Sequence, residues 1–143
     1  MDNYWLKALG GGPRIGRMPD DWRSVGNSLF ERAITFAQRS SVEPGDKIVL
    51  YAAGWGAFFA AGTAESYPYP QEGDDPWRWR VDLSLEHALP AIHDGVPLQV
   101  LNVDGRDLRV AMRRRSHIRL TEAEYGAAVE ALEKKERTLR DRS

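Results

Sequence analysis

The sequence predicts an α+β domain built on a small, strongly bent sheet or barrel that helices flank. Strand-like segments dominate the middle of the chain, where residues alternate in polarity or form short apolar runs between turn residues. Two capping boxes, one early and one late, each precede an apolar stripe at helical spacing. Strands with one helix inserted early and one appended late are typical of the α+β class.

The composition limits the function classes. The 143 residues suffice for one domain with a hydrophobic core. The formal net charge is −1, so nucleic-acid binding would need a local basic patch. Cysteine is absent, which excludes disulfides, thiolate metal sites and cysteine nucleophiles. Neither a signal-peptide pattern nor a membrane-length apolar run is present, so we expect a cytoplasmic location and no membrane partner.

The N-terminal third predicts a strand, a loop and a helix. Tyr4 to Leu9 read as a strand that stops at a run of glycines and a proline. A loop extends to Gly26, and Ser28 to Glu31 form the first capping box. The helix that follows is expected to bury an apolar stripe made by Leu29, Phe30, Ala33, Ile34 and Ala37.

A hairpin is predicted around Gly54-Trp55-Gly56. Lys47–Ala53 would be its first strand and Ala57–Ser66 its second, with the glycines reversing the chain between them. Pro68 and Pro70 are expected to stop strand pairing, because proline has no amide hydrogen to donate.

The segments after the hairpin predict more β-structure. Trp77–Glu86 alternates as a half-buried strand, and Leu89–Ile92 and Val96–Leu101 read as shorter β pieces. Asn102–Arg109 reads as a turn centred on Asp-Gly, and the basic segment Ala111–Leu120 reads as a strand.

The second capping box, Thr121 to Glu124, predicts a docked C-terminal helix. Its apolar stripe consists of Tyr125, Ala128, Val129 and Leu132. From Glu133 on the chain is almost all charge, which indicates a solvated helix end that frays. We therefore expect a single domain over residues 1–132 and a charged helix end or tail over 133–143.

The basic segment is a candidate phosphate-binding surface. On a strand, alternate side chains share a face, so Arg113, Arg115, His117 and Arg119 would point the same way. With Arg17 and Arg23 of the loop, these arginines would contact a nucleic-acid backbone. The alternative is a solvated strand face paired with carboxylates.

The tryptophans suggest where a planar ligand would stack. Trp77 and Trp79 share a face with Val81, which favours core packing. Trp55, between two glycines at a hairpin tip, favours a ligand or partner contact, and Trp22 on the loop is similar. Stacking on such a side chain contributes about 1–3 kcal/mol per base.

Three stretches together resemble the EVE domain, a member of the PUA-like superfamily that also includes YTH and ASCH domains. They are Pro44–Tyr51, Gly62–Pro70 and Arg113–Tyr125, and the resemblance extends over about Asn3 to Leu132. It implies a small β-barrel with an aromatic pocket that holds a nucleobase, often a modified one, beside a basic surface.

The resemblance places Trp5, Trp22 and Tyr51 near that pocket, and the hairpin tip adds Trp55. Asn27 is our expectation for a hydrogen bond to the base edge, since its amide both donates and accepts. Tyr51-Ala52-Ala53 departs from the family pattern, because many EVE domains have Tyr-His-Ser there.

We therefore expect a non-catalytic domain that binds RNA or DNA and needs no cofactor. The three histidines lack metal-ligand spacing with one another, and Gly10-Gly11-Gly12 lacks the rest of a phosphate-binding loop. One alternative is a hydrolase of a modified nucleoside, as in the ASCH branch, although Gly45-Asp46-Lys47 departs from that branch's motif. Another is a protein-interaction module that uses Trp55 and the acidic loop.

Overall fold

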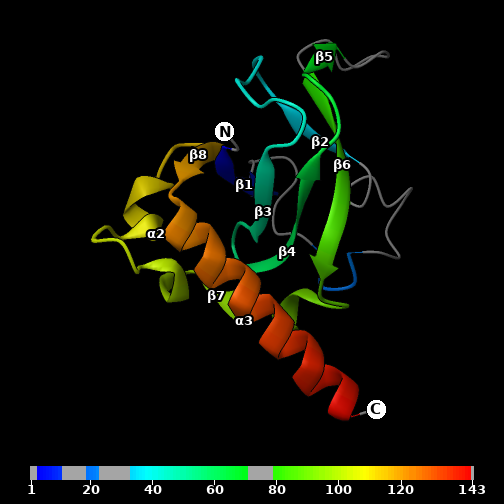
Figure 1. Cartoon of the computed structure of the whole chain (residues 1–143), viewed down its shortest axis with the longest axis vertical. Coiled ribbons are helices and arrows are strands. Elements are labelled where there is room, and N and C mark those ends of the chain that lie inside the picture. Colours follow the sequence, from blue (N-terminus) through cyan, green and yellow to red (C-terminus); the bar gives the residue numbers. More distant parts are fainter. Residues whose placement is uncertain (1–2, 11–18, 23–32, 71–78, 143) are drawn as a thin grey trace.

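A computed structural model of the chain describes residues 3–10, 19–22, 33–70 and 79–142. Their fold is α+β, as the sequence predicts: a strongly curled mixed sheet with helices against it (Figure 1). The strands are β1 Tyr4–Leu9, β2 Ala33–Phe36, β3 Lys47–Ala52, β4 Ala57–Ala64, β5 Tyr69–Pro70, β6 Trp79–Ala88, β7 Val96–Pro97 and β8 His117–Leu120. The α-helices are α2 Leu108–Ala111 and α3 Glu122–Asp141, and Ile92–Asp94 and Leu98–Leu101 form 3-10 turns η1 and η2.

The main path of the sheet runs β2-β6-β4-β3-β1-β8. β1 is parallel to β3, and the other pairs described are antiparallel, so the sheet is mixed. Its two end strands approach each other across the curl, because the rings of Phe36 in β2 and His117 in β8 lie 4.8 Å apart. The sheet is therefore a half-barrel with an inner and an outer face.

The β3–β4 hairpin confirms the expected pair of strands. Gly54 and Gly56 flank the turn with φ of 87° and 70°, a region that glycine adopts without steric cost. The register between the strands shifts between Leu50 and Tyr51, which marks a bulge close to the turn.

One expected helix is partly wrong. Ala33–Phe36 is strand β2, which pairs antiparallel with Asp82 to Trp79 of β6. Ala33, Ile34 and Phe36 are buried in this strand, so pairing and burial outweigh the helical spacing of the sequence. The capping box from Ser28 to Glu31 lies outside the described residues.

The expectation that strand pairing stops at the prolines is also wrong. Tyr69–Pro70 forms β5, in which Tyr69 pairs with Arg80 and Pro70 with Trp79. Both residues of β5 are exposed and lie at the margin of the sheet, and edge strands tolerate proline.

The segments between β6 and α3 contain less β-structure than expected. Only Val96–Pro97 pairs with β4; the neighbouring pieces are η1 and η2. The Asp104-Gly105 turn is confirmed by a φ of 83° at Gly105, but it leads into α2, which Asp107 caps. The basic strand is shorter than expected, because β8 begins only at His117.

Helix α3 begins with the predicted capping box, in which Thr121 and Glu124 exchange hydrogen bonds. It continues to Asp141, so the described part of the charged C-terminal segment is helical rather than frayed. Tyr125 packs against Tyr4 at 5.0 Å between ring centroids, which places α3 on the outer face of the sheet. None of the described helices is long and apolar enough to span a membrane.

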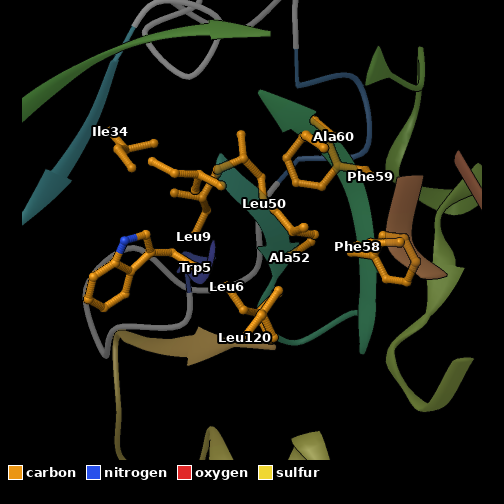
Figure 2. Close-up of a cluster of buried hydrophobic side chains, with 14 of the residues drawn as sticks. Trp5, Leu6, Leu9, Ile34, Leu50, Ala52, Phe58, Phe59, Ala60 and Leu120 are labelled. Atoms are coloured by element: carbon orange, nitrogen blue, oxygen red, sulfur yellow. The ribbon is translucent and has the colours of Figure 1, made fainter. Parts of the chain in front are cut away.

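The core has two parts, one on each face of the sheet. Phe58 and Phe59 are adjacent in β4 and point to opposite sides, as alternation in a strand requires (Figure 2). Gly62 lets β4 approach β6 closely, since a Cβ there would lie 2.9 Å from the Cα of Leu85. On the inner face, the polar side chains Lys7 and His117 lie opposite each other at the β1–β8 edge, both near the Phe36 ring.

Candidate nucleic-acid interface

A groove of about 650 Å³ opens at the β8 edge of the half-barrel, and we call it the basic groove. It is lined by Trp5, Arg106, Val110, Ala111, Arg113, Arg115, His117, Ile118 and Arg119. The expected set of Arg113, Arg115, His117 and Arg119 therefore does gather at one surface. They do not gather because they alternate along one strand, as the prediction assumed. Arg113 and Arg115 belong to the turn after α2, and His117 and Arg119 belong to β8.

The pairing of β1 with β8 positions the aromatic wall of the groove. Trp5 lies opposite Arg119 in the register, and Lys7 lies opposite His117. The guanidinium carbon of Arg119 is 5.1 Å from the centre of the Trp5 ring, within cation–π range. The His117 ring is 5.6 Å from the Trp5 ring, so an imidazole and an indole lie side by side.

Trp5 is held rigidly from behind. Its Nε1 donates to Oδ2 of Asp46 at 3.0 Å, and the same carboxylate accepts the backbone amide of Glu43 at 2.9 Å. Asp46 is itself buried, and only 5% of Trp5 is exposed. The indole thus forms a fixed wall, of which Arg119 covers part.

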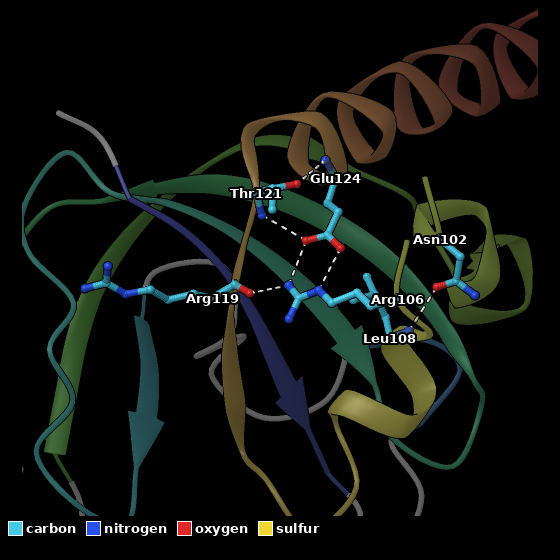
Figure 3. Close-up of polar contacts among 6 residues, drawn as sticks. All are labelled: Asn102, Arg106, Leu108, Arg119, Thr121 and Glu124. Carbon is cyan, nitrogen blue, oxygen red and sulfur yellow. Dashed lines mark hydrogen bonds and ion pairs between the residues drawn. The ribbon is translucent and has the colours of Figure 1, made fainter. Parts of the chain in front are cut away.

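Arg106 is anchored beside this wall by a buried carboxylate (Figure 3). Its Nε and Nη2 donate to Glu124 at 2.8 and 2.7 Å, and Nη2 also donates to the backbone carbonyl of Arg119 at 2.5 Å. Burial alone would raise the pKa of Glu124, but hydrogen bonds from Arg106 and the Thr121 backbone outweigh it and lower the pKa. The Arg106 side chain therefore stays charged and ties the groove to the start of α3.

His117 contributes an uncharged ring to the groove at neutral pH. Burial, followed by repulsion from Lys7, lowers its pKa. The ammonium of Lys7 lies 4.6 Å from the centre of the Phe36 ring, on the inner face of the sheet. Nδ1 of His117 is 2.7 Å from the Ser116 hydroxyl, so one nitrogen of the ring already has a hydrogen-bonding partner.

The remaining arginines of the groove are available to a ligand. Arg113, Arg114 and Arg115 are exposed, and within the described residues no ion pair or side-chain hydrogen bond involves them. The turn is tight, because Arg114 has a φ of 60° and the Arg115 amide donates to the Met112 carbonyl at 3.0 Å. A short backbone segment thus concentrates positive charge at the mouth of the groove.

The residues expected to form one aromatic pocket do not lie together. Tyr51 and Trp55 line a separate hollow of about 540 Å³ at the hairpin turn, which we call the hairpin hollow. Its other lining residues are Gly54, Gly56, Ala57, Ile92, His93, Gly95, Pro97, Gln99 and Arg109. Of the expected base-binding residues that the structure describes, only Trp5 lines the basic groove.

Trp22 is a core residue rather than a pocket residue. It is fully buried, its Nε1 donates to the Leu89 carbonyl at 2.9 Å, and its ring packs 5.0 Å from that of Phe59. The loop position that suggested an accessible indole does not prevent burial, because the ring reaches into the inner core. Arg17, Arg23 and Asn27 lie outside the described residues.

The sequence reasoning missed Arg106, which lines the groove, and Lys7, which lies beside it opposite His117. Arg106 follows an Asp-Gly turn and Lys7 lies in an apolar strand, so local pattern marks neither as functional. A lysine within an otherwise apolar strand is the one available signal for Lys7, which is only 5% exposed. Among the residues that the structure describes, no cluster of His, Asp and Glu could hold a metal ion.

Comparison with known proteins adds the fold but no function. No protein-family model matches the chain, and no curated protein matches it. A hypothetical protein from Leishmania major superposes with a TM-score of 0.58 at 14% identity, over 95% of this chain and 98% of that one. A protein from Rhodopseudomonas palustris, solved by NMR, gives 0.53 at 13% identity over 91% and 92%. A crystal structure from Agrobacterium tumefaciens gives 0.49 at 22% identity over 86% and 88%.

Proposed function

We propose that this chain is an EVE-type domain of the PUA-like superfamily that binds RNA or DNA through the basic groove without catalysing a reaction. The observation that carries the proposal is the gathering of Arg113, Arg115 and Arg119 beside the Trp5–His117 wall. The resemblance of three sequence stretches to EVE domains and the strongly bent mixed sheet both support it.

The charge of the groove favours a phosphate backbone as the ligand. The whole chain carries a formal net charge of −1, yet among the described residues four arginines and no carboxylate line the groove. Arg106 is partly neutralised by Glu124, which leaves three guanidinium groups for an anionic partner. Guanidinium groups bind phosphate oxygens with two parallel hydrogen bonds, which makes this surface suited to nucleic acid.

The aromatic wall adds a place for one base. A base that entered the groove would replace the Arg119 guanidinium over the indole of Trp5, and His117 would lie at its edge. The freed Arg119 would then contact the adjacent phosphate. A neutral His117 supplies a hydrogen bond to the base edge, so the site has the means to prefer one base or a modified one.

The test is fluorescence anisotropy with short single- and double-stranded RNA and DNA, each with and without methylated cytosine or adenine, at several salt concentrations. Each phosphate contact contributes about 0.7 to the slope of log affinity against log salt for a single strand. We expect the double variant Arg113→Ala/Arg115→Ala to lose about 1.4 of that slope.

Arg142→Ala is the matched control, because Arg142 is an exposed arginine at the far end of α3. It removes one positive charge, against two in the double variant, without touching the groove, so its salt slope should equal that of the unmodified chain. Absence of binding to every probe at low salt would disprove the proposed function, as would equal slopes for the double variant and the control.

A further inference from the structure

The hairpin hollow is a second concave surface with the side chains of a ligand site. It combines two half-buried aromatic residues, Tyr51 and Trp55, with the amide of Gln99 and the guanidinium of Arg109. Within the described part of the chain it shares no lining residue with the basic groove. The use proposed for the groove does not account for it.

The backbone of the hollow is well fixed. The Trp55 amide donates to the Ala52 carbonyl at 3.2 Å, and the Leu98 amide donates to the Gly56 carbonyl at 3.1 Å. Gly95 packs tightly at the bottom, where a Cβ would lie 3.0 Å from that of Ala57. The half-buried indole therefore occupies a rigid turn at the hollow.

The charge of the hollow also favours an anionic ligand. Arg109 is exposed, and the described part of the chain offers its guanidinium no ion pair. The other basic residue of the hollow, His93, already pairs with Asp20, with 2.7 Å between its Nδ1 and the carboxylate. Arg109 is thus the group that would contact a phosphate, beside aromatic rings that would contact a base.

The short helix α2 joins the two surfaces. Arg109 lines the hollow, whereas the next two residues, Val110 and Ala111, line the basic groove. The two surfaces face opposite sides of the sheet, because Tyr51 of the hollow pairs with Ala8, three residues along β1 from Trp5 of the groove, and side chains alternate along a strand. Helix α2 at the edge of the sheet is therefore the element that links them.

We propose that a single strand of nucleic acid extends from the basic groove across α2 into the hairpin hollow, where a second base stacks near Trp55 and Arg109 contacts the backbone. This inference rests on the proposed function of the groove and names its ligand as a single strand of several nucleotides. A continuous duplex does not suit the two surfaces together. One base would have to leave the stack to reach the groove, and a second base would have to leave it to reach the hollow.

The first test is the dependence of affinity on length. A dinucleotide reaches one surface only, whereas an oligonucleotide of about eight nucleotides reaches both, within the range known for single-strand sites. We expect the longer probe to bind at least tenfold more tightly than the dinucleotide of the same bases. Equal affinity of the two lengths would overturn the inference.

Two variants assign the gain to the hollow. Trp55→Ala and Arg109→Glu should each weaken the longer probe about tenfold and leave the dinucleotide unchanged. Tyr67→Ala removes an aromatic side chain that is 61% exposed and lines neither surface, and it should change neither probe. Because Arg109 is exposed, its variant still reports if Trp55→Ala fails to fold.

The outcomes separate this inference from the proposed function. If the dinucleotide and the longer probe both fail to bind, the groove itself is not a nucleic-acid site. If both bind and the variants of Trp55 and Arg109 leave the longer probe unchanged, the groove function stands and the hollow has no part in it. Tighter binding of a duplex than of the matching single strand would also overturn the inference.

Discussion

At the scale of single residues, Glu124 has more than one task. It is fully buried, and its carboxylate accepts hydrogen bonds from Arg106 and from the Thr121 amide. Its own backbone amide donates to the Thr121 hydroxyl, which completes the capping box. One carboxylate thus starts α3 and holds the arginine that fixes the β8 backbone. Loss of this group would affect both the helix and the groove.

Glu124→Ala should lower the free energy of unfolding by about 2 kcal/mol, since a charge-assisted pair and a cap are lost together and Arg106 is partly solvated. Glu122→Ala is the control, because Glu122 is an exposed residue of the same first turn. Urea denaturation of the two variants measures the difference. Similar stabilities would show that the Arg106 contact contributes little.

The same residue predicts a direction for the pH dependence. The folded-state pKa of Glu124 is lowered, so its contribution to stability is present above the unfolded pKa and is lost as pH falls through the folded pKa. The stability difference between the unmodified chain and Glu124→Gln should therefore shrink on acidification below about pH 4.5. Urea midpoints at neutral and acidic pH test this, and a constant difference would contradict it.

Trp22 gives the opposite kind of prediction, because its indole is structural. Trp22→Phe leaves the Leu89 carbonyl without its donor, which should cost about 1–3 kcal/mol in the free energy of unfolding. Nucleic-acid affinity of the folded variant should stay unchanged. Thermal unfolding and anisotropy measured on the same sample check both halves, and a loss of affinity without a loss of stability would return Trp22 to the binding site.

At the scale of elements, the sheet depends on how closely its strands approach each other. Gly62 lies where the β4–β6 register shifts, and a side chain there would meet the backbone of Ser84 and Leu85. Gly126 in α3 has open space around its Cβ position. A side chain at position 62 would therefore disturb the packing of the two strands, whereas a side chain at position 126 would change only the helix propensity.

Gly62→Ala should destabilise the protein, because β4 and β6 would have to separate. Gly126→Ala should stabilise it by about 1 kcal/mol, since alanine favours an exposed helical position over glycine. Thermal melts of both variants provide the comparison. A stable Gly62→Ala variant would mean that the close approach of the two strands is not required.

The element-level predictions from sequence succeeded where local chemistry alone sets the structure. The capping box of α3 and the glycines at the hairpin turn specify their geometry within a few residues. β2 was mispredicted because Ala33–Phe36 reads equally as a helix face and as a strand, and only β6 decides between them. The short helices η1 and η2 lie in segments whose apolar residues fit either structure.

At the scale of the whole molecule, two histidines make opposite contributions to the pH dependence of stability. Burial lowers the pKa of His117, so its contribution is lost as pH falls below the unfolded value near 6.5. The hydrogen bond to Asp20 raises the pKa of His93, so its contribution is present at low pH and is lost as pH rises through the folded pKa. The two effects partly cancel in the unmodified chain.

Replacing one histidine at a time should reveal how the other contributes to the pH dependence of stability. Between about pH 7 and pH 5, above the range of ordinary carboxylates, His117→Gln should lose less stability on acidification than the unmodified chain, and His93→Gln should lose more. Urea denaturation at the two pH values measures both changes. A shift of the same sign in both variants would contradict the assignment.

The sequence predicted the arginines of the candidate site but not the arrangement of its aromatic residues. The run from Arg113 to Arg119 is visible as a basic cluster, and the structure gathers it at one groove. The aromatic residues were expected in one pocket, yet Trp5 lines the groove, Tyr51 and Trp55 line the hollow, and Trp22 lies in the core. Their separation in space has no counterpart in their spacing along the chain.

The sequence by itself determined the α+β class, the hairpin, the start of α3 and the concentration of arginines before it. These features depend on contacts between near neighbours in the chain, such as a cap, a turn or an alternation of side chains. Only the tertiary structure decided that β1 lies parallel to β3 and beside β8, which brings Trp5 under Arg119. Pairing between distant strands is settled by burial and register across the whole sheet, and no short stretch of sequence specifies it.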